Sequence, residues 1–221
     1  MKLLVTAGPT REPIDPARFI SNRSSGKMGY AVAAAAVKNG HSVTLISGPV
    51  SLGPPAGVRC VNVITAAEML RAVEKNIRQC DALVMSAAVS DFRPAACHAR
   101  KIKKHAFKLL LPLKRNPDIL MRMIPRKEGR VFVGFAAETG APEREALRKL
   151  RRKNLDLVVA NDIGRKDSGF EADTNRACFI DACGKVKKLP LMSKARLGGL
   201  IVRWIERKLA ARRHKRKEKI K

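Results

Sequence analysis

Short apolar runs alternate with amphipathic stretches along most of this chain. Runs of Val, Ile, Leu and Ala between polar or Gly/Pro breaks predict buried strands at residues 2–7, 42–47, 60–64, 82–89, 131–137 and 155–160. The stretches between them predict helices at residues 26–39, 65–79 and 142–153, and one that starts at residue 116. Because strands that alternate with helices form parallel sheets, we expect an α/β fold, a Rossmann-like three-layer sandwich with a mainly parallel sheet.

Local signals refine these elements. Thr65, with Glu68 three residues on, predicts a capping box. Asn116 before Pro117 predicts an N-cap followed by proline at the first helical position, and Ser193 predicts the cap of a last helix. Residues 176–181 and 185–191 predict a hairpin that turns at positions 183–184. The basic segment 100–108 and the apolar residues 109–113 predict a β flap or hairpin excursion.

The stretch from Val5 to Gly29 predicts an anion site. An apolar strand ends in Thr6, Ala7 and Gly8, a long polar loop follows, and Ser24-Ser25-Gly26-Lys27 opens an Ala-rich helix. Backbone N–H groups and the helix dipole favour an anion at such a corner. The spacing matches neither G-x-G-x-x-G nor the Walker P-loop.

Notable residues also follow the other predicted strands. The carboxyl ends of such strands lie at the edge where ligands bind. These residues are Ala87, Ala88 and Asp91 after one strand, Phe135 to Glu138 at the end of the next, and Asn161 with Asp162 after the last. Their convergence would form a pocket. Taken alone, Asp91 could instead be a helix cap or turn residue, and Phe135 is better explained as a core residue.

Lysines form two clusters. Lys149 and Lys153 are spaced i, i+4 and therefore share one helix face, which suits a triphosphate. A solvated basic face explains the same spacing at least as well. Lys101, Lys103 and Lys104 form the second cluster. The four histidines are scattered, which gives little support to a His-based metal site or catalytic triad.

Composition adds a strong positive charge. The 221 residues carry 46 Lys and Arg against 19 Asp and Glu, a net charge of +27, which points to anionic partners. Residues 207–221 hold nine of these cations and one Glu, a net +8, and we expect this basic tail to be a frayed or disordered end after a domain of residues 1–206. The five cysteines have no C-x-x-C spacing and predict free thiols. No apolar run reaches the length of a membrane span and no signal peptide is evident, so we expect a cytoplasmic protein.

Six ordered segments carry a family resemblance: TAGPTREPIDPARFISNRSSGKMG, AAVSDF, KIKK, NPDIL, GFAAET and KNLDLVVANDI. They closely resemble bacterial phosphopantothenoylcysteine synthetase, the coenzyme A enzyme that joins 4′-phosphopantothenate to L-cysteine with CTP. The resemblance covers about residues 1–205. In many bacteria this domain follows a flavin-dependent decarboxylase. Because this chain starts on its first strand, we expect a free-standing synthetase without decarboxylase activity.

The resemblance also implies residue roles. It implies that Asn22 holds an acyl-cytidylate intermediate and that Lys101, on a mobile flap, serves the second step. It implies phosphopantothenate contacts from Arg18, Asn22, Ala87 and Ala88. It implies nucleotide contacts from Gly8, Ser24, Gly26, Gly29, Asp91, Pro117, Asp118, Ile119, Leu120, Phe135, Lys149 and Lys153. Family members are dimers and require Mg²⁺, but no carboxylate cluster in this sequence identifies the metal ligands.

Two other classes of function remain open on the residues alone. A Rossmann-type nicotinamide oxidoreductase would use the same opening βαβ unit, but it would need G-x-G-x-x-G and an acidic residue where Ser47-Gly48 stands. A nucleic-acid-binding protein would explain the charge of +27. We expect no nucleic-acid partner, because one Trp and one Tyr provide little stacking surface.

Overall fold

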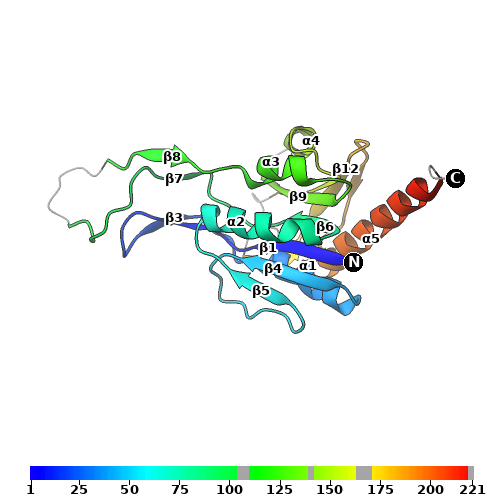
Figure 1. Ribbon diagram of the computed structural model, residues 1–221, viewed down its shortest axis with the longest axis horizontal. Helices are drawn as coiled ribbons and strands as arrows, with labels where there is room; N and C mark the ends of the chain where they lie inside the picture. The colour runs from blue at the N-terminus through cyan, green and yellow to red at the C-terminus, as the bar shows by residue number, and fades with distance from the viewer. Residues whose placement is uncertain (104–109, 139–141, 163–170, 219–221) are drawn as a thin grey trace.

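The computed structural model describes residues 1–103, 110–138, 142–162 and 171–218. An eight-stranded sheet with the order β13-β12-β10-β9-β6-β1-β4-β5 forms the centre (Figure 1). Its strands are β1 (Lys2–Ala7), β4 (Ser42–Ser47), β5 (Arg59–Asn62), β6 (Ala82–Met85), β9 (Val131–Glu138), β10 (Leu157–Asp162), β12 (Ala177–Asp181) and β13 (Val186–Lys188). All pairings from β5 to β10 are parallel, and β12 and β13 add an antiparallel edge. The predicted mainly parallel sheet is confirmed.

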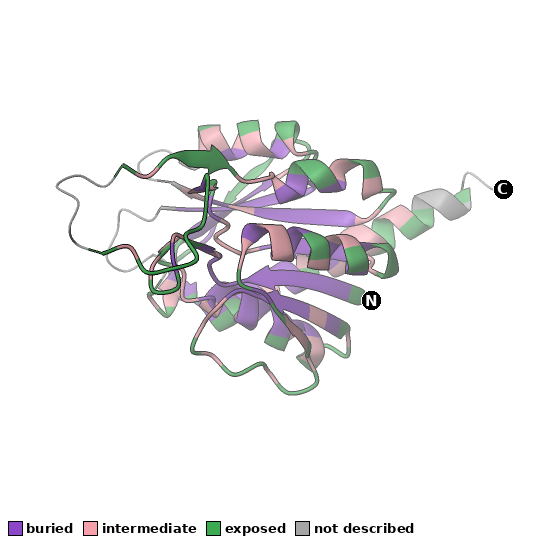
Figure 2. Cartoon of the chain, turned by 60° about the vertical axis from the view of Figure 1, so that its left-hand side comes forward, coloured by how far each residue is buried: buried purple, intermediate pink, exposed green. Residues whose placement is uncertain are grey.

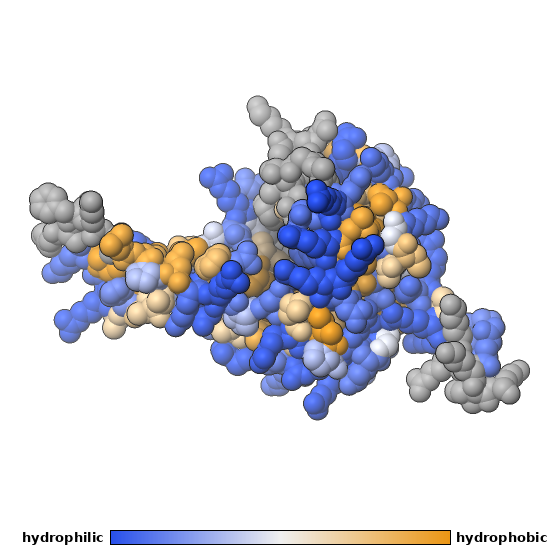
Figure 3. Space-filling view, turned by 90° about the horizontal axis from the view of Figure 1, so that it is seen from above, coloured by the Kyte–Doolittle hydropathy of each residue, from blue (hydrophilic) through white to orange (hydrophobic). Residues whose placement is uncertain are grey.

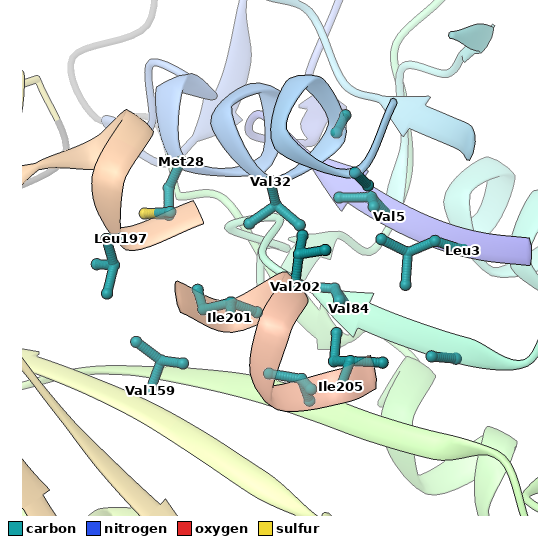
Figure 4. Packing of buried hydrophobic residues seen from close by; sticks show 14 of the residues in the cluster. Leu3, Val5, Met28, Val32, Val84, Val159, Leu197, Ile201, Val202 and Ile205 are labelled. Atoms are coloured by element: carbon teal, nitrogen blue, oxygen red, sulfur yellow. The ribbon is translucent and has the colours of Figure 1, made fainter. Parts of the chain in front are cut away.

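Helices cover both faces of this sheet. One layer contains α1 (Lys27–Lys38) and α5 (Lys194–Glu218), and the other contains α2 (Ala66–Asn76), α3 (Ile119–Met123) and α4 (Pro142–Arg152), with short 3-10 turns η1 (Ile77–Gln79) and η2 (Ile124–Arg126). Successive strand residues point to opposite faces. Leu3 and Val5 therefore pack with α1 and α5, whereas Leu4 joins the other core (Figure 4). The three-layer sandwich is confirmed.

An arm extends from the carboxyl edge of the sheet. It consists of the antiparallel pair β2 (Arg11–Pro13) and β3 (Phe19–Ser21) and the pair β7 (Phe92–Pro94) and β8 (Leu113–Arg115) (Figure 1). Figure 2 shows that the arm is largely exposed, in contrast to the buried strands of the sheet. The β7–β8 pair confirms a β excursion. The centre of the expected flap, residues 104–109, lies outside the described residues.

Several local predictions are confirmed and two are wrong. Thr65 and Glu68 form the capping box, Ser193 caps α5, and the hairpin turns at Cys183-Gly184. The strand predicted at residues 82–89 ends at Met85. Beyond it the Ala87 and Ser90 N–H groups bond the Thr6 and Thr10 hydroxyls, and a single bridge between Ala88 and Pro9 replaces the continuous ladder. The N-cap of α3 is Asp118, not Asn116: the Asp118 carboxylate accepts a hydrogen bond from the Met121 N–H, and Asn116 bonds Ser90 and Arg93 instead.

The basic tail also differs from the expectation. Helix α5 continues unbroken to Glu218, so residues 207–218 are neither frayed nor disordered. The Arg212 guanidinium donates to the carbonyl oxygens of Gly129 and Arg130 and lies 2.5 Å from the Asp156 carboxylate. These three acceptors, of which Asp156 is buried, hold the helix in place although its like charges repel one another. Residues 219–221 lie outside the described part of the chain.

Candidate functional site

The order of the parallel strands reverses between β1 and β6, which creates a crevice at their carboxyl ends. Residues 86–90 form a strap across this crevice. The Ala88 N–H donates to the Gly8 carbonyl at 2.9 Å, and the Ser90 N–H donates to the buried Thr10 hydroxyl at 3.0 Å. These bonds hold the strap in place and leave it as one wall of a cavity.

The predicted corner between β1 and α1 also forms. Gly26 occupies the N-cap position of α1 with a φ of 77°, a left-handed conformation that a residue with a side chain adopts at a cost. A Cβ on Gly29 would lie 2.5 Å from the Ala7 Cβ, so only glycine lets α1 approach β1 so closely. Gly29 is buried against β1 and lines neither of the two cavities described below, which makes it a packing residue of this corner.

A cavity of about 330 Å³ occupies the crevice. Most of the predicted site residues line it, namely Asn22, Ala87, Ala88, Asp91, Pro117, Asp118, Ile119, Leu120, Phe135, Lys149 and Lys153. The Asn22 side-chain amide donates to the Ala88 carbonyl at 3.0 Å, so the loop before α1 and the strap meet at the cavity wall. Residues from five separate parts of the chain are thus brought to one place.

The two lysines of α4 have partners at this cavity. Lys149 donates to the Phe135 carbonyl, and Lys153 Nζ lies 2.9 Å from the Asp118 carboxylate. Burial raises the pKa of Asp118, but the hydrogen bond and charge of Lys153 outweigh burial, so this pKa lies below its usual value. Because Asp118 also caps α3, one carboxylate positions both that helix and an ammonium group at the cavity.

A smaller adjoining pocket of about 60 Å³ extends the site to the start of α1. It contains the predicted Ser24 and Gly26, and it shares Ser86, Phe135 and Ala137 with the larger cavity. Sequence reasoning missed Lys27 and Lys194 as lining residues and did not consider Asn175. The sequence contained some indication of these lysines, because Lys27 lies in the quoted motif and Lys194 follows a predicted helix cap. It did not indicate that they line one pocket, because the packing of α1 on α5 brings them together.

The electrostatics of this smaller pocket favour an anion. Burial lowers the pKa of Lys194 to about 8, with a further decrease from the nearby Lys27 and an opposing effect from Asp173. Lys27 Nζ lies 2.6 Å from the Asp173 carboxylate. Both lysines stand in the first turn of their helices, where the dipole also favours negative charge.

Arg18 and Lys101 lie outside both cavities, and Arg18 contacts Ile102, the neighbour of Lys101, by donating to its carbonyl oxygen at 3.3 Å. The buried Asp15 carboxylate accepts from the Arg18 guanidinium at 2.9 Å and from the Ile102 N–H at 3.1 Å. Burial raises the pKa of Asp15, but the backbone donors at Ala17, Ile102 and Arg18 and the Arg18 charge lower it below its usual value. Lys101, exposed beside Ile102, is therefore anchored at the base of its segment to the loop that carries Arg18.

The position where a dinucleotide enzyme would bind ribose is already occupied. At the end of β4, the buried Ser47 hydroxyl bonds the Tyr30 hydroxyl at 3.0 Å and donates to the Gly48 carbonyl. Among the residues that the structure describes, no acidic side chain directly follows β4 to accept the ribose hydroxyls, as a dinucleotide-binding fold requires. This local arrangement disfavours the nicotinamide oxidoreductase.

Comparison with known proteins identifies the family. Residues 1–209 match the DNA/pantothenate metabolism flavoprotein C-terminal domain. The chain belongs to this family. It is 47% identical over 206 residues to the coenzyme A biosynthesis bifunctional protein CoaBC of Escherichia coli strain K12, covering 91% of this chain and 50% of that protein. It is 48% identical over 193 residues to the CoaBC of Bacillus subtilis strain 168, covering 87% and 48%.

Solved structures share the fold of this chain. The crystal structure of the C-terminal domain of a CoaBC protein superposes with a TM-score of 0.82 at 40% identity, covering 95% of this chain and 96% of that one. The Cab2 mutant H337A in complex with phosphopantothenate-cysteine gives a TM-score of 0.78 at 18% identity, covering 98% and 88%, which shows the shared fold. The chain spans about half the length of the curated relatives it matches.

Proposed function

We propose that this chain is a phosphopantothenate–cysteine ligase of coenzyme A biosynthesis. One observation carries the proposal: in a member of this family, Asn22, the strap at Ala87-Ala88 and the two α4 lysines line one cavity at the switch point of the sheet. A carboxamide donor, exposed backbone and ammonium groups together suit a substrate that carries phosphates and a reacting carboxylate.

The proposed reaction has two steps. A carboxylate oxygen of 4′-phosphopantothenate attacks the α-phosphorus of CTP, the bond to the β-phosphate oxygen breaks, and pyrophosphate leaves. The amine of L-cysteine then attacks the carbonyl carbon of the acyl-cytidylate, expels CMP and loses a proton. Negative charge develops on phosphate and carbonyl oxygens in both steps, so positioned cations and N–H donors stabilise the transition states.

The residues divide between the two substrates. Arg18, Asn22, Ala87 and Ala88 would bind phosphopantothenate, and Lys101 would act in the second step from the segment anchored at Ile102. Gly8, Ser24, Gly26, Asp91, residues 117–120, Phe135, Lys149 and Lys153 would hold the nucleotide. The larger cavity contains residues of both sets, among them Asn22, Ala88 and Lys149, so the two substrates would meet there. A nucleotide contact from Gly29 would require its backbone alone.

Magnesium would enter with CTP. Among the described residues, no group of three or more His, Cys, Asp or Glu side chains could hold a metal ion by itself. The cavity does contain Asp91 and Asp118, and Lys153 already pairs with the second. This donor set fits Mg²⁺ held mainly by substrate phosphates with one carboxylate, as is common for nucleotide complexes. The ion would neutralise charge on the triphosphate when bound.

One assay tests the proposed activity. We expect phosphopantothenate, L-cysteine, Mg²⁺ and CTP to yield CMP and pyrophosphate in equal amounts, with kcat/KM far higher for CTP than for ATP. Omission of L-cysteine should leave only a single turnover of pyrophosphate release. Comparable kcat/KM for both nucleotides would refute the CTP preference, and no pyrophosphate with either would refute the ligase.

The α4 lysines provide a test of the nucleotide site. A charge-assisted hydrogen bond to phosphate contributes about 1.5–3 kcal/mol, so Lys149→Ala and Lys153→Ala should each raise the KM for CTP by roughly tenfold to a hundredfold. The KM for L-cysteine should not change. Arg151→Ala is the matched control on the same helix, because Arg151 is exposed and lines neither cavity. Arg152 is a poorer control, since it lies 3.8 Å from Asp118. Equal effects at Arg151 and the lysines would indicate diffuse positive potential instead of a site.

A homodimer and a cytoplasmic location complete the proposal. The dimer is supported by large apolar side chains that the arm exposes, Phe19 at 48%, Phe92 at 46% and Leu113 at 49% (Figure 3). Exposed apolar patches commonly mark protein–protein contacts, and sedimentation equilibrium would test whether two copies associate. No helix in the described part of the chain is both long and apolar enough to cross a membrane.

A further inference from the structure

A second concave surface lies at the opposite edge of the sheet from the candidate active site. It is a groove of about 350 Å³ between helix α5 and the β12–β13 hairpin, lined by Leu157, Phe179, Asp181, Lys185, Lys187, Trp204, Arg207, Lys208 and Ala211. Leu157 opens the parallel strand β10, whereas the nucleotide cavity adjoins the carboxyl ends of β6 and β9. We call this surface the basic groove.

The basic groove carries an excess of unneutralised positive charge. Four cations line it, Lys185, Lys187, Arg207 and Lys208, against the single carboxylate of Asp181. That carboxylate already accepts hydrogen bonds from the backbone N–H groups of Cys183 and Lys185 in the hairpin turn. Within the described residues, no ion pair joins any of the four cations to an acidic side chain. The groove therefore presents a local field that favours a polyanion.

An aromatic side chain lies among these cations. Trp204, the one tryptophan of the chain, lines the groove, and Lys208 Nζ lies 5.9 Å from the centroid of its ring. Trp204 is partly exposed, while Phe179, which lines the same groove, is buried. Cations that flank an aromatic surface are the combination that binds single-stranded nucleic acid, with phosphates on the cations and a base against the ring.

The groove is preformed by the tertiary structure. Arg212, one turn beyond Lys208, bonds the buried Asp156 and the carbonyls of Gly129 and Arg130, which fixes the direction of α5 along the groove. On the other side, the antiparallel pairing of β12 with β13 fixes Lys187 opposite Phe179. Because the backbone of both walls is already fixed, binding does not need to order these elements.

We propose that the basic groove binds single-stranded nucleic acid through its phosphate backbone, without base-specific readout. We expected no nucleic-acid partner because the chain has few aromatic residues. The sequence contains no sign that its one Trp would line a groove together with four cations. An acidic membrane surface fits less well. The described residues of α5 expose no large hydrophobic side chain to enter a bilayer, and the site is concave.

The test compares two variants with equal loss of charge. The groove variant is Lys185→Gln/Lys187→Gln/Arg207→Gln/Lys208→Gln. The control, Arg71→Gln/Lys75→Gln/Arg122→Gln/Arg144→Gln, changes exposed cations on α2, α3 and α4, across the sheet from α5. Binding of a fluorescein-labelled oligouridylate is measured by anisotropy at increasing salt, and Trp204 fluorescence is recorded in parallel. Ligase turnover with CTP serves as a check of folding, since none of these eight side chains lines the nucleotide cavity.

The expected results are specific to the groove. Each phosphate contact on a single strand contributes about 0.7 to the magnitude of the slope of log K against log salt. Removal of four contacts should therefore reduce this magnitude by about 3. Affinity should fall at least tenfold in the groove variant and remain near wild type in the control, and oligouridylate should quench Trp204 in the wild type. Equal losses in both variants, an unchanged Trp204 signal, or binding to phosphatidylserine vesicles but not to oligouridylate would overturn the proposal.

Discussion

The Asn22→Asp variant is expected to form the acyl-cytidylate but to transfer it to L-cysteine roughly 100- to 1,000-fold more slowly, the cost of losing one preorganised donor to a developing oxyanion. In the structure the Asn22 amide lies at the cavity wall and donates to the Ala88 carbonyl. A carboxylate at this position cannot donate, and its charge repels the carbonyl oxygen that becomes negative when the amine attacks in the second step.

Rapid-quench experiments with mass spectrometry would measure the two steps separately. Pyrophosphate release in the first turnover should stay near the wild-type rate, and the intermediate should accumulate. Asn62→Asp is a charge-matched control, because Asn62 is exposed at the end of the outermost strand β5 and lines neither cavity. Wild-type condensation in Asn22→Asp would contradict the role proposed for this residue. Equal loss of both steps would place Asn22 in substrate binding alone.

The Asp156→Asn variant is expected to lose about 3–5 kcal/mol of unfolding free energy, the usual cost of removing one partner from a buried ion pair. The Asp156 side chain is 4% exposed. It accepts from the Phe132 N–H at 2.9 Å and lies 3.1 Å from Lys127 Nζ and 2.5 Å from the Arg212 guanidinium. The substitution would leave both cations without their carboxylate.

Urea titration at several pH values would measure this effect. Burial lowers the pKa of Lys127, Asp156 raises it, and the net pKa is already below 10.5. Loss of Asp156 lowers it further, so the unfolded state then binds the proton more tightly than the folded state. Stability of the variant should therefore recover as pH rises toward 10.5. Asp173→Asn is the matched control: the Asp173 side chain is 86% exposed, so its pair with Lys27 should contribute at most about 1 kcal/mol.

The same contact changes the expectation for the tail. The sequence predicts a dispensable end from residue 207, because like charges repel and few apolar residues are available for burial. The structure instead attaches Arg212 to Asp156, whose position in the chain gives no sign of this pairing. Truncation after residue 207 would leave that buried carboxylate short of one partner. That the tail is dispensable for catalysis stays a prediction. We now also expect its removal to lower the free energy of unfolding.

The sequence alone determined the features that depend on residues close together in the chain. Apolar periodicity specified β1 and β4 to the residue, because burial on both faces of a parallel strand requires continuous apolar runs. The turn at Cys183-Gly184 and the cap at Thr65 followed from hydrogen bonds between near neighbours. The ordered motifs resembled a family, and the match over residues 1–209 confirms that resemblance.

Tertiary structure decided the features that depend on distant residues. Asp118 displaced Asn116 as the α3 cap because Arg93 and Ser90, from another loop, hold the Asn116 amide. Lys27 and Lys194 meet only because α1 packs on α5, and the basic groove exists only because the β12–β13 hairpin lies beside that helix. A sequence pattern reports interactions within a few residues. The positions of long, charged side chains are set by elements that fold against them from far along the chain, so they emerge only with the packed structure.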